Sequence, residues 1–223
     1  MNRARLTQLL CLGAALCIGS STARAQGIRV FAEGSGSFFL NQKFFTAASE
    51  PFRSDYASGG KITFGAEFTP WKIAGLEAAY GYGTNNLRVT NLNANQTQGY
   101  GVKSERLSAN LVVHSPVGLL HLKPYATAGL EYDHFGPTGQ AKTNAITIGF
   151  GNQSVSLGAS NKVGINYGGG IEWSFVPKLA LRVDIRDHIT GTPTYGLTSG
   201  QYSVSGLGHD AELSAGIVIH LGK

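Results

Sequence analysis

Cysteine is scarce in this chain and is confined to one end of it. Of the 223 residues two are cysteine, Cys11 and Cys17, and both lie among the first 25 residues. Beyond that point the chain therefore has no disulfide framework. Long apolar runs are also missing, because no later segment approaches the roughly 20 apolar residues that a membrane-spanning helix needs. These absences exclude a disulfide scaffold and a helical membrane protein.

The first 25 residues have the features of a cleaved secretory signal peptide. Arg3 and Arg5 supply a positive start, residues 9–18 form a short apolar segment, and Ala23-Arg24-Ala25 fits an A-x-A cleavage site. We therefore expect residues 1–25 to be a secretory signal and residues 26–223 to form one domain. Loss of the three arginines in this segment lowers the formal net charge from +5 to +2, which argues against a nucleic-acid partner.

Strict alternation of apolar and polar residues dominates the rest of the chain. In residues 179–188, LALRVDIRDH, three aliphatic residues alternate with three charged ones: Leu181, Val183 and Ile185 with Arg182, Asp184 and Arg186. Successive side chains of a strand point to opposite faces, so one face is apolar and the other is charged. The same alternation predicts eight strands, at residues 29–39, 61–69, 76–83, 106–114, 123–133, 165–175, 179–188 and 211–221. Few of the remaining segments have the hydrophobic period of a helix, so few helices are available to cover the apolar faces of these strands.

The connections between the predicted strands alternate between short and long. The short ones carry turn residues, at Pro70, Ser115-Pro116 and Pro177-Lys178. The others are rich in Asn, Gly, Ser, Thr and Gln, as in NNLRVTNLNANQTQG at 85–99, and such long loops are unusual in a compact soluble domain. The pattern predicts an all-β fold, an eight-stranded antiparallel closed transmembrane β-barrel with short periplasmic turns and long extracellular loops. Aromatic residues near both strand ends are typical of interfacial girdles.

Strand alternation also predicts which charged residues face the barrel interior. We expect a lumenal charge network with a structural role, because eight strands leave an interior that side chains fill and because both signs of charge are present. The alternative is a path for protons or ions along the same residues. The predicted members are Arg29, Glu33, Lys61, Glu67, Glu77, Arg106, Lys123, Glu131, Glu172, Arg182, Asp184, Arg186 and Glu212.

Three further patterns are candidates for chemistry. His114, His121 and His220 face the lumen by alternation and could bind zinc or copper, but their spacing is not a ligand motif. Gly168-Gly169-Gly170 lacks the Lys-Ser/Thr and the helix of a P-loop, so a structural role is favoured. His114-Ser115 and His209-Asp210 form no recognisable catalytic triad. We expect no catalytic residue, no metal and no cofactor.

KPYATAGLEY, INYGGGIEW and LRVDIRD resemble segments of the small outer-membrane β-barrel domains related to OmpA and OmpX. The resemblance covers most of residues 26–223 and implies a location and a fold but no reaction. It implies contacts with outer-membrane lipid and lipopolysaccharide, with periplasmic chaperones and with the barrel-insertion machinery, which usually reads a final aromatic residue; here the chain ends His220-Leu221-Gly222-Lys223. We expect a non-catalytic monomer that supports envelope integrity or surface interaction through its loops. The alternatives are a narrow channel or carrier for small solutes, and a lipid-modifying enzyme.

Overall fold

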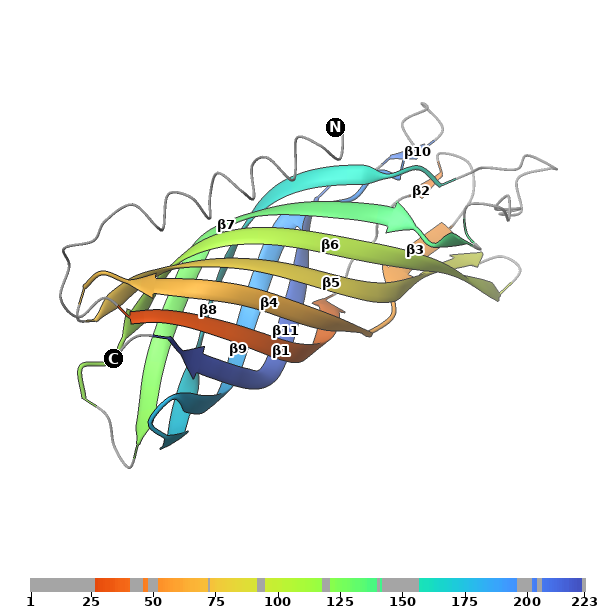
Figure 1. The fold of residues 1–223 in the computed structure, drawn as a ribbon. Helices are drawn as coiled ribbons and strands as arrows, with labels where there is room; N and C mark the ends of the chain where they lie inside the picture. Colours follow the sequence, from red (N-terminus) through yellow and green to blue (C-terminus); the bar gives the residue numbers. More distant parts are fainter. Residues whose placement is uncertain are drawn as a thin grey trace.

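The computed structural model describes residues 27–40, 46–47, 52–71, 73–91, 95–117, 121–139, 141, 157–195, 202–203 and 206–221. The predicted signal peptide at 1–25 lies outside these residues. Within the described ranges, no helix is both long enough and apolar enough to cross a membrane. Most of the described residues belong to strands (Figure 1).

Eight of the described strands form a closed antiparallel barrel, which confirms the predicted fold. In chain order they are β1 (Gly27–Leu40), β4 (Gly59–Thr69), β5 (Ala74–Asn91), β6 (Gln96–His114), β7 (Leu122–Pro137), β8 (Ser160–Val176), β9 (Leu179–Gly191) and β11 (Leu207–His220). Each strand pairs with the next along the chain, and the pairing of β1 with β11 closes the ring. Arg29 of β1 accordingly lies opposite His220 of β11 and Glu67 of β4.

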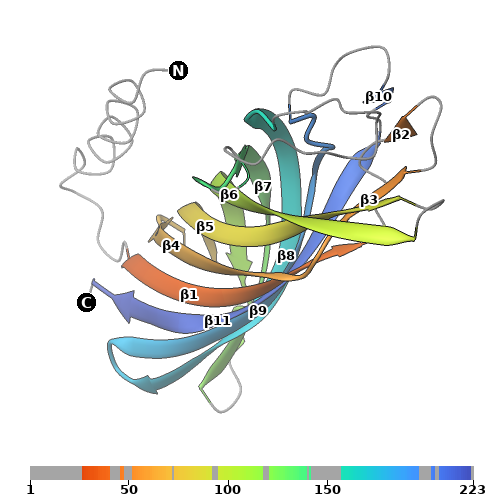
Figure 2. The same ribbon diagram turned by 90° about the vertical axis from the view of Figure 1, so that its right-hand side faces the viewer.

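Three shorter strands lie at the end of the barrel where the long connections are. β3 (Phe52–Tyr56) pairs with the outer part of β5, and β2 (Thr46–Ala47) pairs with β10 (Tyr202–Ser203). Figure 2 views the molecule from this side and shows β2 and β10 beyond the end of the ring. This end therefore carries structure of its own, while the opposite end consists of the short connections 70–73, 115–121 and 177–178.

The prediction that residues 85–99 form a loop is wrong for most of that segment. β5 and β6 continue to Asn91 and from Gln96, with residue pairs from Asn85↔Val102 to Asn91↔Gln96, so they extend past their neighbours as a long hairpin (Figure 1). The hydroxyls of Thr90 and Thr97 are 2.9 Å apart across it. The polar composition suggested a loop, but cross-strand pairing and a buried inner face hold the segment as strand.

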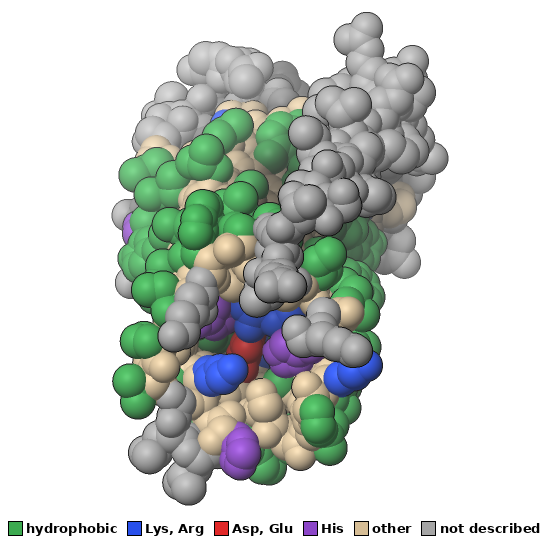
Figure 3. Space-filling view, turned by 60° about the vertical axis from the view of Figure 1, so that its left-hand side comes forward, with side chains coloured by type: hydrophobic (Ala, Val, Ile, Leu, Met, Phe, Trp, Pro, Cys, Tyr) green, Lys and Arg blue, Asp and Glu red, His purple; other side chains and the backbone are tan. Residues whose placement is uncertain are grey.

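The two faces of the barrel wall follow the predicted alternation. Outward-facing aliphatic and aromatic side chains are exposed around the wall, with Ile185 61% exposed and Leu130 65% exposed. Trp71 and Trp173 are exposed near the short-turn end, and Tyr82 and Tyr167 nearer the other end. Figure 3, seen toward the short-turn end, shows hydrophobic side chains covering the wall and charged and histidine side chains gathered in the hollow between them.

The inward face is not uniformly polar. Phe31, Ala79, Ala180 and Val218 form a small buried apolar cluster inside the barrel. Val112 is also fully buried, at the same end of β6 as His114. Alternation identifies these positions as inward-facing, and their apolar character means that the charged residues share the interior with packed hydrophobic side chains.

Candidate functional site

The candidate site is the charged interior of the barrel, and the structure places twelve of the thirteen predicted residues there as buried side chains. Lys123 is the exception: it is the second residue of β7, it is exposed, and it forms no ion pair with the described residues. Its position at the mouth, where the wall ends, leaves its ammonium group in contact with solvent. Lys123 therefore does not belong to the buried network.

At the short-turn end, Arg29 joins acidic residues from two other strands. Its guanidinium donates a hydrogen bond to Glu172 Oε2 of β8 at 2.8 Å, and it also pairs with Glu67 of β4. His114 of β6 contacts the same carboxylate, with 2.8 Å between its Nε2 and Glu67 Oε1. Four strands are thus tied together at this level of the barrel.

The middle of the barrel contains two arginines that share three acidic residues. Arg182 Nη2 lies 2.9 Å from Glu77 Oε2, and Arg182 Nε lies 3.0 Å from Glu33 Oε1. Arg186 Nη1 lies 2.8 Å from Glu77 Oε1, and Arg186 Nη2 lies 3.1 Å from Asp184 Oδ2. Such forked pairing of guanidinium and carboxylate fixes geometry as well as charge.

Arg182 is also held between two aromatic rings. Its guanidinium carbon lies 4.6 Å from the ring centroid of Phe31 and 4.5 Å from that of Tyr125, which is the arrangement of a cation–π contact. The Tyr125 hydroxyl donates a hydrogen bond to Asp184 Oδ2 at 2.6 Å. Ser214 donates to the other oxygen of the same carboxylate. The side chain of Arg182 is 1% exposed, so these contacts and its ion pairs replace water completely.

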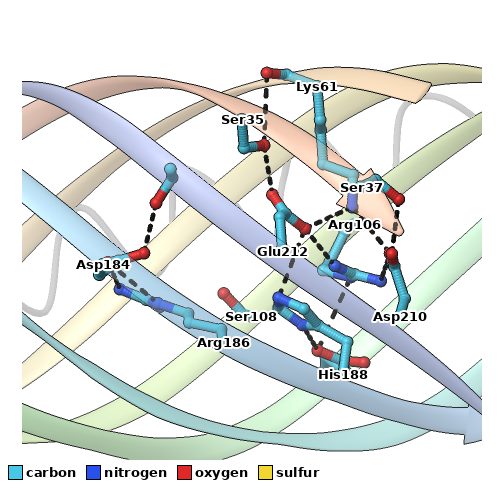
Figure 4. A network of polar contacts seen from close by, with 12 residues as sticks. Ser35, Ser37, Lys61, Arg106, Ser108, Asp184, Arg186, His188, Asp210 and Glu212 are labelled. Carbon is cyan, nitrogen blue, oxygen red and sulfur yellow. Dashed lines mark hydrogen bonds and ion pairs between the residues drawn. The ribbon is translucent and has the colours of Figure 1, made fainter. Parts of the chain in front are cut away.

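A third cluster lies toward the outer end of the barrel (Figure 4). Arg106 of β6 reaches Asp133 Oδ1 at 2.8 Å, Glu212 Oε2 at 2.9 Å and Asp210 Oδ2 at 3.2 Å. Lys61 of β4 approaches the last two residues from the opposite side, at 2.7 Å from Glu212 Oε2 and 3.3 Å from Asp210 Oδ2. One arginine and one lysine thereby bind carboxylates from two walls of the barrel.

His188 completes this third cluster. Its Nδ1 lies 2.6 Å from Glu131 Oε2 and its Nε2 lies 3.4 Å from Glu212 Oε2, so the imidazole bridges two carboxylates (Figure 4). His188, Asp133 and Asp210 were not among the predicted members. Alternation could have found all three, because His188 and Asp133 follow Arg186 and Glu131 by two residues and Asp210 precedes Glu212 by two.

Acidic residues outnumber lysine and arginine in this interior. The buried groups are nine acids, five bases and two histidines: Glu33, Glu67, Glu77, Glu131, Asp133, Glu172, Asp184, Asp210 and Glu212; Arg29, Lys61, Arg106, Arg182 and Arg186; His114 and His188. A buried charge is costly unless it is paired and hydrogen-bonded, and breaking such a pair is more costly still. Each arginine or lysine contacts more than one acidic residue, and this sharing offsets the cost of burying more acids than bases.

The network leaves little space in the lumen. The cavity between the middle and outer clusters measures about 30 Å³ and is lined on its two sides by Asp184 and Arg186 and by Lys61 and Arg106. A cavity of that volume has room for about two or three water molecules. The clusters therefore act chemically as a packed polar filling that binds the walls to one another.

Buried apolar side chains also lie toward the outer end of the barrel, beyond the charges. We call this group the outer cap; its members are the buried side chains of Tyr56, Leu87, Val89, Tyr100, Val102, Phe135, Leu157 and Tyr195. The hydroxyls of Tyr56 in β3 and Tyr195, which follows β9, contact each other and so join two long connections. Burial raises the pKa of Tyr195, which keeps its phenol neutral. Leu87, Val89, Tyr100 and Val102 alternate along the β5–β6 hairpin, a signal that could have revealed the hairpin.

The other candidates from the sequence, the three histidines and the His209-Asp210 pair, do not come together in the structure. His114 is buried against Glu67, His121 is exposed in a turn with a φ of 66°, and His220 is half-buried at the end of β11. His121 precedes β7, so strand alternation did not apply to it. Within the described ranges no three His, Cys, Asp or Glu side chains are grouped to hold a metal ion. His209 faces outward while Asp210 faces inward, so this pair does not act together.

The chain can be compared with known proteins by its sequence and by its fold. The sequence model of one family, described as the outer membrane protein beta-barrel domain, matches residues 10–210. Among solved structures, OprG from Pseudomonas aeruginosa has 12% identity and a TM-score of 0.59, over 88% of this chain and 97% of OprG. AlkL, determined by solid-state NMR in DMPC bilayers, has 13% identity and a TM-score of 0.57, over 92% of this chain and 95% of AlkL. No curated protein matches the sequence. Because the sequence identity is this low, the similarity to these structures shows a shared fold and nothing more.

Proposed function

The chain belongs to the outer membrane protein β-barrel domain family, and on that premise we propose that it is a non-catalytic barrel acting at its extracellular end. The protein is integral to the outer membrane. In such barrels the short turns face the periplasm and the long connections face outward, so the outer cap and the β5–β6 hairpin are extracellular. The proposed role is to support the envelope or to make surface contacts, without passing solutes.

One observation supports the proposal: charged and apolar side chains both occupy the interior of the barrel. The cavity between the charge clusters measures about 30 Å³, and the side chains of the outer cap are buried beyond them. Aqueous channels occur in barrels of about 16 strands or more, and an eight-stranded interior is just wide enough for side chains. A carrier or channel would need both layers to open together.

The β5–β6 hairpin is the part of the barrel best placed to meet a partner. Its outward face presents the short polar side chains of Thr84, Asn86 and Thr97, which are exposed, together with Arg88, which pairs with Asp55 of β3 at 2.8 Å. Pairing with β3 on one side of β5 stiffens the hairpin. A rigid polar sheet of this kind supports surface contact better than it supports catalysis, which needs a nucleophile and a base in one place.

Liposome swelling tests whether solutes pass. Proteoliposomes that contain the folded protein should swell in small sugars or amino acids no faster than empty liposomes. A second experiment replaces residues 87–100 with a two-residue turn between the paired residues Asn86 and Gly101, which leaves the transmembrane part of the barrel intact. If the protein acts through its surface, the shortened barrel should insert normally but should not complement a strain from which the gene has been deleted. Rapid swelling with the unmodified protein would instead favour the channel alternative.

A further inference from the structure

Glu131 of β7 reaches across the neighbouring strand to His188 of β9. On the strand between them, β8, Glu131 lies opposite Gly164, which has no side chain. A Cβ at Gly164 would lie 2.5 Å from the carbonyl oxygen of Ile189 and 3.1 Å from Glu131 Oε1, so glycine leaves the room for this contact. Glu131 Oε2 and His188 Nδ1 are 2.6 Å apart, and the imidazole therefore donates a hydrogen bond to the carboxyl group.

The other oxygen of Glu131 faces a second carboxyl group. Asp133 lies two residues further along β7, on the same inward face, and its side chain is within hydrogen-bonding reach of Glu131. Glu131 Oε1 and Asp133 Oδ2 are buried, and neither accepts a hydrogen bond from an N–H or O–H group of the described residues. Ionised carboxylates only accept hydrogen bonds, so two of them repel each other unless one carries a proton.

The surroundings of Glu131 and His188 contain more acids than bases. The charged groups that face this pair come from five strands: Lys61 of β4, Arg106 of β6, Asp133 of β7, Arg186 of β9, and Asp210 and Glu212 of β11. Arg186 is itself paired with Glu77 and Asp184, so Lys61 and Arg106 remain for four carboxyl groups.

Of these four carboxyl groups, that of Glu131 has the weakest contact with Arg106. The distance from Arg106 Nε to Glu131 Oε2 is 3.7 Å, whereas Arg106 approaches the other three acids to between 2.8 and 3.2 Å. The side chain of Glu131 is 0% exposed, so water does not solvate it. An ionised carboxylate without a close cation is costly in such a place, and the group takes up a proton instead.

We propose that Glu131 holds a proton at neutral pH and releases it at alkaline pH, which makes the outer part of the barrel sensitive to pH. In the protonated state, hydrogen bonds run from His188 to Glu131 and from Glu131 to Asp133, whose Oδ1 accepts from Arg106 at 2.8 Å. Loss of the proton leaves two carboxylates facing each other without a donor. This site goes beyond the proposed function, because it concerns how the closed barrel responds to pH and not what its surface contacts.

The stability of the barrel should therefore fall as the pH rises. Above about pH 7 an unfolded chain has ionised glutamates and mostly neutral histidines, so it binds no proton at either position. The folded barrel still binds one proton at Glu131, and the state that binds more protons is favoured at lower pH. The equilibrium constant for folding should drop by up to about tenfold for each pH unit while this proton is lost, and should then level off.

Urea unfolding in lipid vesicles, repeated from about pH 7 to about pH 10, measures this dependence. Glu131→Gln keeps the shape of the side chain and donates a hydrogen bond to Asp133 at every pH. The matched control is Glu172→Gln, because Glu172 is also buried in the lumen but is paired with Arg29 at 2.8 Å. Glu131→Gln should remove about one proton from the pH dependence, and Glu172→Gln should retain the dependence of the unmodified protein.

Infrared spectroscopy of the folded protein detects the proton itself, because a protonated carboxyl group and an ionised one absorb at different frequencies. At neutral pH the unmodified protein and Glu172→Gln should show the absorption of a buried carboxylic acid that Glu131→Gln lacks. In the unmodified protein this absorption should disappear as the pH is raised, a result that does not require any variant to fold.

Three results overturn the proposal. The first is an equal pH dependence of unfolding in the unmodified protein and in Glu131→Gln. The second is that no protonated carboxyl group is detected in the unmodified protein at neutral pH. The third is a stability that rises with pH above about pH 7, which would mean that the folded state binds fewer protons than the unfolded chain. None of the three bears on whether solutes pass, which liposome swelling tests separately.

Discussion

Arg182 of β9 and Glu77 of β5 meet in the centre of the barrel, with 2.9 Å between guanidinium and carboxylate, although their strands lie on opposite walls. β5 and β9 are separated by β4, β1 and β11 in the order of the sheet. This ion pair therefore spans the lumen. A contact across the diameter both stabilises the closed ring and blocks the path along its axis, so the same residues serve the fold and the proposed function.

Replacing Arg182→Met should destabilise the barrel strongly. The substitution leaves Glu33 and Glu77 short of a buried partner, and removing one member of a buried pair costs about 3–5 kcal/mol. Urea unfolding of the protein in lipid vesicles measures the free energy. Arg88→Ala is the control, because Arg88 and Asp55 form an exposed pair that contributes about 1 kcal/mol or less. Equal losses for the two variants would contradict the structural role of the interior pairs.

Ile185→Arg should destabilise the barrel through its outer face. Ile185 faces outward near the middle of β9, and an arginine near the membrane midplane costs about 2–4 kcal/mol. Val163→Arg, near the outer end of β8 and 73% exposed, should cost about 1 kcal/mol or less by the same depth dependence. The comparison uses reversible unfolding in vesicles, and a silent Ile185→Arg would show that this face does not contact lipid.

Gly168→Ala should destabilise the barrel although it adds only a methyl group. A Cβ at Gly168 would overlap the carbonyl oxygen of Ile185 and press on Arg186, and such overpacking costs about 1–3 kcal/mol. A Cβ at Gly34, by contrast, meets nothing within 4 Å, so Gly34→Ala serves as the neutral control. The measurement is the unfolding midpoint of each variant, and a tolerated alanine at 168 would leave the glycine run without a structural explanation.

Tyr195→Ala should loosen the outer cap while the barrel below it stays closed. Tyr195 is 1% exposed and contacts Tyr56, which pairs with Leu87 of the hairpin, so its truncation leaves Tyr56 and the strand beside it less well packed. Hydrogen exchange should then accelerate at Leu87 and Val89 but not in the spanning part of β9. Uniform acceleration along all strands would show that the cap and the barrel unfold together.

Alternation along the strands predicted the barrel and most of its interior charges because a period of two assigns every residue of a strand to one face. Alternation could not predict the pairing of Arg182 with Glu77, since that contact depends on how far the strands are staggered around the ring. Nor could it show that Lys123 is exposed, because a residue at the mouth has the same alternation as one deep inside. Alternation also could not predict the contact of Asp187 with His209, because these residues are distant in sequence and meet only when β9 pairs with β11.

The conductance of single proteins in planar bilayers tests most directly whether the lumen is closed. The unmodified protein should show no sustained current, or only rare small openings, because the charge clusters and the outer cap fill the interior. Replacing Arg182 and Arg186 together with alanine removes bulk and leaves Glu77 and Asp184 short of partners, so this variant should leak more. Stable, large and reproducible conductance steps from the unmodified protein would contradict the closed lumen.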